Sequence, residues 1–235
     1  MLHKDRTAAE WRSVVYTTRR RRRILRTGFF KNSFWKEDDV MRKKAHVYLA
    51  KYLADNLEWE ELCDHRKAFC LGSFLPDCKP SFLTVPHHYN KIYDRTINMI
   101  EELVDEANSD MNMRVFCRRL GEVTHYIADS FTYPHNAEVF PGHFIAHCRY
   151  EKYLTIELRK YMTGAKINPL REKYKKMESV QEIEAFFQKA HDNYLEGIHG
   201  LERDISFIVE ACFQIVEAII EMFHASHQRR FVPIT

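Results

Sequence analysis

Histidines and carboxylates recur at helical spacing in the middle of the sequence. His125 is followed four residues later by Asp129. The same spacing separates His147 from Glu151, and His135 lies between the two pairs. Side chains four residues apart lie on one face of an α-helix, so each pair is arranged to bind one ion. Imidazole and carboxylate groups are ligands that Zn²⁺ accepts. The spacing therefore predicts a metal site built from two helices and the segment that joins them.

A simpler explanation exists for each pair taken alone, because a histidine four residues from an aspartate is usually part of a surface hydrogen bond. The neighbouring residues argue against it here. Apolar and aromatic side chains such as Tyr126, Ile127 and Phe131 lie among the polar groups, which places those groups near a core. Buried imidazoles and carboxylates are costly unless they are paired or bind a metal. The cluster as a whole therefore favours a metal site.

A helix predicted from Met41 adds a further candidate ligand, His46. This histidine follows the apolar pattern of Leu49 and Leu53, and a lone histidine on an apolar face is usually a packed core residue. It becomes a candidate because other ligands occur elsewhere in the chain.

The segment 70–90 is predicted to be a loop, since Gly72 and three prolines interrupt any helix there. It carries Asp77, His87 and His88. Ordered loops often carry functional residues. The alternative is a surface turn with Pro-Asp at its corner.

Helical periodicity covers most of the remaining chain, and no strand-length alternation or repeat is present. The last helix has one narrow polar stripe, so it is predicted to lie in a bundle and not in a membrane. The fold class is therefore all-α: a single compact domain of about seven or eight helices, with the metal cluster in a cleft between them. The predicted helices cover residues 41–56, 57–69, 93–107, 111–129, 142–161, 180–197 and 201–228.

Composition narrows the class of protein further. Hydrophobic residues make up 45% and charged residues 29% of the 235, as in an ordinary soluble domain. None of the six cysteines forms a C-x-x-C pair, which argues against a zinc ribbon or a disulfide scaffold and favours reduced thiols. Residues 1–40 hold eleven of the 36 basic and five of the 33 acidic side chains, so the remainder has a net charge of −3. A mildly acidic body does not favour a nucleic-acid partner, although it does not exclude one.

Residues 1–40 differ from the rest of the chain and include five consecutive arginines. They contain no apolar run typical of a signal peptide and no transmembrane segment. We interpret them as a disordered basic tail or as an extension from a misplaced start, with Met41 as the true start. A cytoplasmic location is the corresponding expectation.

Four motifs in order resemble the zinc-dependent phospholipase C family, whose fold is shared with single-strand-specific nucleases. They are GSFLPD, HHY, HYIADSFTYPH and HCRYE. The resemblance spans about residues 42–151 and implies that 41–235 is a helical domain of this type. It also implies a cluster of up to three metal ions, mostly zinc, between helices. The implied ligands, grouped by ion, are Asp77, His87, His125 and Asp129; then His135, His147 and Glu151; then His46 with a shared Asp129.

Three details refine what the resemblance implies. His87 is preferred to His88 because it leaves Tyr89 at the aromatic position of the pattern. Secreted members also use an N-terminal tryptophan for the third ion, and no cut that frees Trp35 is evident, so two or three zinc ions per chain are expected. Cys78 stands where choline-preferring members carry an aromatic residue, so the resemblance does not extend to a choline preference.

The function implied is hydrolysis of phosphodiester bonds, most of all phospholipase C-type cleavage of a phospholipid head group by zinc-activated water. Asp77 is the expected catalytic residue, as ligand and general base. Glu151 favours the phospholipase branch, since the nucleases typically have aspartate there. A nuclease of the same fold, or a zinc-binding protein without activity, remains the alternative.

Overall fold

A computed structural model describes residues 33–78, 89–106, 112–164 and 176–230. Helices make up most of these ranges, and no strand occurs within them, which confirms the predicted all-α class. The α-helices are α2 (Ser33–Asn56), α3 (Glu60–Asp64), α4 (Arg66–Phe74), α5 (Tyr89–Glu106), α6 (Met113–Ser130), α7 (Phe144–Gly164), α9 (Val180–Leu195) and α10 (Leu201–Arg230). Two short 3₁₀ turns carry candidate ligands, η1 (Pro76–Cys78) and η3 (Tyr133–His135).

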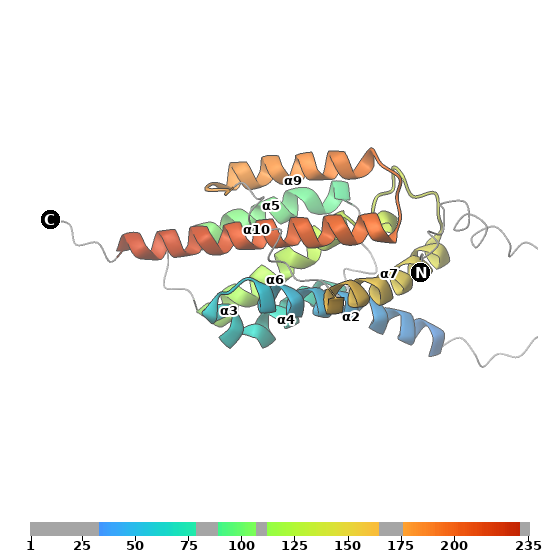
Figure 1. Ribbon diagram of the computed structural model, residues 1–235, viewed down its shortest axis with the longest axis horizontal. Helices are drawn as coiled ribbons and strands as arrows, with labels where there is room; N and C mark the ends of the chain where they lie inside the picture. The colour runs from blue at the N-terminus through green and yellow to red at the C-terminus, as the bar shows by residue number, and fades with distance from the viewer. Residues whose placement is uncertain (1–32, 79–88, 107–111, 165–175, 231–235) are drawn as a thin grey trace, which may run out of the picture.

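The long helix α10 runs through the molecule and contacts helices on both sides (Figure 1). It packs against α5 and α9 as one group and against α6 and α7 as another, while α2 contacts α4 and α7. The polar stripe predicted for α10 is partly exposed, and Ile215 and Ile219 on its other faces are fully buried. This is the arrangement expected of a bundle helix.

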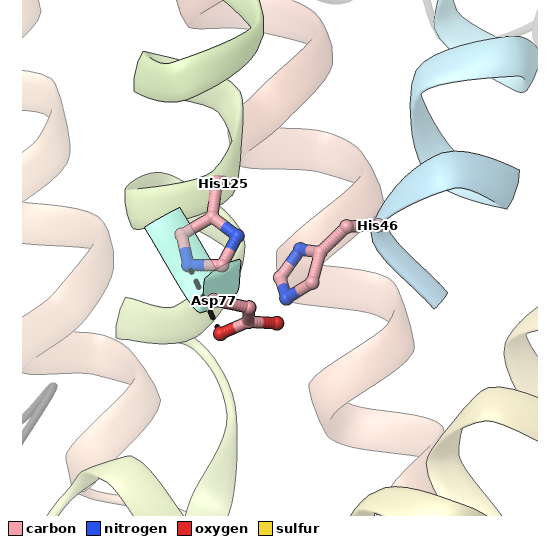
Figure 2. A group of neighbouring side chains, drawn as sticks. All are labelled: His46, Asp77 and His125. Carbon is pink, nitrogen blue, oxygen red and sulfur yellow. Dashed lines mark ion pairs between the residues drawn. The ribbon is translucent and has the colours of Figure 1, made fainter. Parts of the chain in front are cut away.

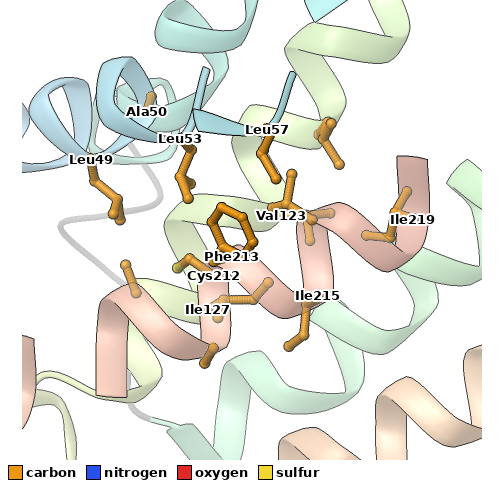
Figure 3. Close-up of a cluster of buried hydrophobic side chains, with 14 of the residues drawn as sticks. Leu49, Ala50, Leu53, Leu57, Val123, Ile127, Cys212, Phe213, Ile215 and Ile219 are labelled. Atoms are coloured by element: carbon orange, nitrogen blue, oxygen red, sulfur yellow. The ribbon is translucent and has the colours of Figure 1, made fainter. Parts of the chain in front are cut away.

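Apolar side chains from three helices meet to form the core shown in Figure 3. Leu53 from α2, Ile127 from α6 and Phe213 from α10 each expose 1% of their surface or less. Complete burial of one such side chain contributes about 1.5–3 kcal/mol to the free energy of unfolding. Because Ile127 lies between His125 and Asp129 in the sequence, the same helix that closes the core also directs the candidate ligands.

Helix α6 begins with a side-chain cap. Asn112 has an extended backbone, and its side-chain oxygen accepts a hydrogen bond from the Arg114 amide at 2.9 Å. The predicted start of this helix at residue 111 was therefore two residues too early. Asn112 lies one residue before the helix begins.

The loop predicted from Cys70 also begins too early, because α4 continues to Phe74. Gly72, which was taken as a helix breaker, is a buried residue of the helix. A Cβ atom built on Gly72 would lie 1.9 Å from the carbonyl oxygen of Arg118 in α6. The glycine is therefore required by the close packing of two helices, which local sequence rules do not detect.

The first helix starts at Ser33, upstream of Met41, so residues 33–40 form part of α2. The predicted boundary at residue 40 is otherwise not tested, since residues 1–32 lie outside the described ranges. The piece predicted at 57–69 is divided into α3 and α4, which meet at His65.

Candidate metal centre

Helix α6 places His125 and Asp129 one turn apart with their side chains buried. The His125 Nδ1 atom lies 2.9 Å from the carbonyl oxygen of Ser73 in α4. A carbonyl only accepts, so Nδ1 carries a proton, and in the neutral ring that a metal requires Nε2 carries the lone pair. A backbone acceptor on the far ring nitrogen is the usual way in which a ligand histidine is oriented.

A first cluster forms around this lone pair from His46 of α2, Asp77 of η1 and His125 (Figure 2). One ligand atom from each lies within 4.8 Å of the others. The rings of His46 and His125 have centroids 4.0 Å apart. The Asp77 Oδ1 atom lies 3.8 Å from His125 Nε2. Three segments distant in the sequence thus direct two imidazoles and a carboxylate toward one point.

A second cluster consists of His135 in η3 with His147 and Glu151 in α7. The Oε1 atom of Glu151 lies 3.1 Å from His135 Nε2 and 2.8 Å from His147 Nε2. As in the first cluster, the ligand atoms of these three residues lie within 4.8 Å of one another. The helical pair in α7 supplies two of these atoms, and the turn at Pro134 brings in the third.

Asp129 lies between the two clusters. Its Oδ1 atom is 3.3 Å from His46 Nε2, and its Oδ2 atom is 3.2 Å from His125 Nε2. The same Oδ2 atom is 3.6 Å from Nδ1 of His135, whose Nε2 faces Glu151. One carboxylate therefore connects the first cluster to the second.

The buried carboxylates of Asp129 and Glu151 both remain ionised. Burial raises the pKa of Asp129, but the charges of His135 and His125 and hydrogen bonds from His125 and His46 hold it well below its usual range. Burial also raises the pKa of Glu151, and hydrogen bonds and charge from His135 and His147 lower it to about 2. A bound divalent cation would supply the positive charge that stabilises these ionised carboxylates. The donor set therefore fits zinc in its atom types, in its charge and in the way its ligand atoms converge.

Seven of the eight predicted ligands are thus brought together, and the eighth, His87, lies outside the described residues together with His88. His46, predicted to bind a separate ion with Asp129, has its Nε2 atom 3.3 Å from Asp129 Oδ1 and also lies directly beside His125 and Asp77. The two helices α2 and α6 position these rings, and no spacing rule relates His46 to His125.

Two polar neighbours of His125 in α6 form contacts of their own. Thr124 donates its hydroxyl to the Leu120 carbonyl at 2.8 Å, and Glu122 accepts from Arg118 at 2.7 Å. The group that orients His125 is instead the backbone carbonyl of Ser73, which has no side-chain signature in the sequence.

Asp204, a fully buried residue in the first turn of α10, was not among the predicted site residues. Its carboxylate accepts hydrogen bonds from the Tyr133 amide and from the hydroxyls of Tyr150 and Tyr194. Burial raises the pKa of Asp204 to about 7, although the three donors act in the opposite direction. An acidic residue at the start of a helix usually indicates only a favourable interaction with the helix dipole. The position of Asp204 in the sequence therefore did not predict this buried hydrogen-bond network.

A second buried network fixes the far side of η3. His191 of α9 lies with Nε2 at 2.8 Å from the side-chain oxygen of Asn136, the residue after His135. The Asn136 amide nitrogen donates to the carbonyls of Ser130 and Thr132. Because those donations fix the amide orientation, Nε2 of His191 must be the donor to the Asn136 oxygen. Tyr89 stacks on the His191 ring with centroids 3.3 Å apart.

A family model described as zinc dependent phospholipase C matches residues 45–201, a range that includes all seven candidate ligands just described. The chain belongs to this zinc-dependent phospholipase C family. The match begins one residue before His46 and passes Glu151 into α10, so it covers both clusters.

The fold of this family member is similar to a solved structure described as alpha toxin from Clostridium absonum. The TM-score is 0.55 and the sequence identity 17%, with 81% of this chain and 65% of the toxin chain covered. At this identity the likeness shows the shared all-α fold, and the chain spans about two-thirds of the toxin's length. A comparison with curated proteins found no match. None of the helices in the described ranges has a stretch long and apolar enough to cross a bilayer.

Proposed function

We propose that this member of the family hydrolyses phosphodiester bonds with two or three zinc ions, by phospholipase C-type cleavage of a phospholipid head group. The observation that carries the proposal is the position of Asp129 between two mostly buried clusters of histidine and carboxylate side chains. Family membership supplies zinc as the metal. When bound, zinc polarises phosphoryl oxygens and lowers the pKa of water toward neutrality.

The chain's own residues divide into two roles. Asp129 and Glu151 remain ionised in the folded protein, so they are available as ligands without first losing a proton. Asp77 is the proposed catalytic residue, because its short 3₁₀ turn is held at the end of α4 while its carboxylate reaches the first cluster. It would bind metal and accept the proton of the attacking water.

The charge of the loaded site favours a phosphate anion. Asp77, Asp129 and Glu151 supply three negative charges, whereas two or three zinc ions supply four or six positive ones. His147 is the most exposed imidazole of the second cluster, with 21% of its side chain accessible compared with 7% for His135. We therefore propose that substrate reaches the second cluster from the side of His147.

The first test combines zinc content with turnover. Purified protein is expected to hold two or three zinc ions and to hydrolyse a chromogenic phosphodiester and phospholipid vesicles, with little release of nucleotides from single-stranded DNA. Asp77→Asn should lose turnover, and Asp105→Asn, at an exposed position of α5, serves as the control. Zinc binding without turnover of any diester would contradict the proposed enzyme and favour a structural zinc protein. Preferential cleavage of DNA would favour the nuclease.

The head group is a separate question, because Cys78 is exposed beside Asp77. A thiol offers no aromatic face to a quaternary ammonium group, so the cation–π contact that favours choline is not available at this position. We expect phosphatidylcholine to be cleaved no faster than phosphatidylethanolamine or phosphatidylserine in matched vesicles. A strong choline preference would contradict this part of the proposal.

A further inference from the structure

One buried carboxylate joins the two segments that carry the second cluster. Asp204 exposes none of its surface. Its Oδ2 atom accepts from the Tyr133 backbone amide at 2.9 Å and from the Tyr150 hydroxyl at 2.8 Å. Its Oδ1 atom accepts from the Tyr194 hydroxyl at 2.8 Å. Three donors therefore satisfy a group that is costly to bury without partners.

Two of these donors are attached to ligand-bearing backbone. Tyr133 is the first residue of η3, and His135 is the last. Tyr150 immediately precedes Glu151 in α7. A single oxygen of Asp204 thus holds the η3 turn and α7 in one register. The distance that depends on this register is the 3.1 Å between His135 Nε2 and Glu151 Oε1.

We propose that Asp204 is a positioning residue for the second metal site, fixing His135 relative to Glu151 and so setting the zinc affinity of that cluster. The inference deepens the proposed function and rests on it. Asp204 does not touch the ligands itself in the contacts described. It acts through Tyr133 and Tyr150, as groups behind metal ligands commonly do.

The chemistry of the three donors requires a carboxylate. An amide in its place presents one oxygen and one NH₂ group, and the NH₂ group would face a tyrosine hydroxyl or a backbone N–H. Asp204→Asn therefore loses at least one of the three hydrogen bonds while it keeps the side-chain shape. Tyr150→Phe removes a single hydrogen bond at the residue next to Glu151.

Tyr194 provides a matched control. It donates to the same carboxylate at the same distance of 2.8 Å, but it comes from α9, which carries no proposed ligand. Loss of either tyrosine hydroxyl removes one hydrogen bond from Asp204. A merely structural role for Asp204 predicts equal consequences for zinc binding from the two substitutions, whereas a positioning role predicts a difference.

The experiment measures zinc dissociation constants by competition with a chromogenic chelator, for the full chain and for Asp204→Asn, Tyr150→Phe and Tyr194→Phe. We expect one zinc ion, that of the second cluster, to bind with about tenfold lower affinity in Asp204→Asn and in Tyr150→Phe. In Tyr194→Phe its affinity should change little. Thermal unfolding of the zinc-free proteins is recorded in parallel. If Asp204→Asn does not fold, the zinc dissociation constants of Tyr150→Phe and Tyr194→Phe are compared instead, and their difference tests the positioning role.

Combining Tyr150→Phe with a substitution in the second cluster tests whether the loss of zinc affinity arises at that cluster. In Glu151→Gln, whose second cluster is already impaired, Tyr150→Phe should cause no further loss of zinc. Unchanged affinity in Tyr150→Phe, or equal losses in Tyr150→Phe and Tyr194→Phe, would overturn the positioning role. Those results are distinct from failure of the proposed function, in which the unsubstituted chain itself would bind no zinc or cleave no diester.

Discussion

Gly72 of α4 and Gly121 of α6 lie against each other's helix with no space for a side chain. A Cβ atom on Gly121 would lie 2.2 Å from the Phe69 carbonyl oxygen and 3.1 Å from the carbonyl carbon of Gly72. This close crossing is what brings the Ser73 carbonyl to His125 Nδ1 at 2.9 Å. The pair of glycines therefore determines where the metal-facing nitrogen of His125 points.

Gly121→Ala is expected to destabilise the protein and to weaken zinc binding, because the new methyl group must push the two backbones apart. Overpacking of this kind costs about 1–3 kcal/mol. Gly164→Ala is the matched control, since a Cβ atom at that glycine, also in a helix, meets no atom within 4 Å. Denaturant unfolding of both variants tests the prediction, and equal stability of the two would refute it.

Asp129→Asn is expected to abolish activity and to lower zinc content while leaving helicity nearly unchanged. The substitution removes a carboxylate that contacts both clusters, yet it keeps the size of the side chain. Metal analysis, circular dichroism and diester hydrolysis provide the three measurements. A fully active variant with its complete zinc content would show that the site is assigned to the wrong residues.

Removal of zinc is expected to lower the melting temperature by an amount that depends on free zinc. A ligand that binds only the folded state stabilises it by RT ln(1 + [L]/Kd), about 2.7 kcal/mol at one hundred times Kd. Glu151→Gln should show a smaller shift between zinc-loaded and chelated protein, because one cluster has lost its carboxylate. Calorimetry over a zinc titration would reveal the difference, and identical shifts would count against the second cluster as a metal site.

The fold is expected to lose stability as the pH falls from about 6.5 toward 4, partly through His191. Burial lowers the pKa of His191 from an ordinary value of 6.5 to about 4, and Glu138 opposes this only in part. The unfolded chain therefore binds a proton over this range that the folded protein excludes, so the contribution is complete above pH 6.5 and is lost as the pH falls to 4.

His191→Gln retains an N–H donor for Asn136 but does not titrate, so its unfolding free energy should depend less steeply on pH in this range. The metal ligands titrate in both proteins and cancel in the comparison. Parallel pH profiles for the two proteins would exclude His191 as a source of the acid sensitivity.

Local periodicity was sufficient to predict much of the site. The pairs His125/Asp129 and His147/Glu151 lie one helical turn apart in the chain, and α6 and α7 keep them so. Helix existence and the all-α class follow from the same periodicity. Errors arose at the ends of elements, as at Gly72 and Asn112, where a contact with another helix or a cap decides the boundary.

The sequence by itself determined which residues are chemically able to bind zinc and which of them share a helical face, because a turn of helix is a local property. Only the tertiary structure decided that His46 lies beside His125 and that Asp129 lies between two clusters. The bond from Tyr133 to Asp204 joins residues 71 positions apart, and no spacing rule extends that far. Helix packing sets these distances, since it fixes how one periodic surface lies against another.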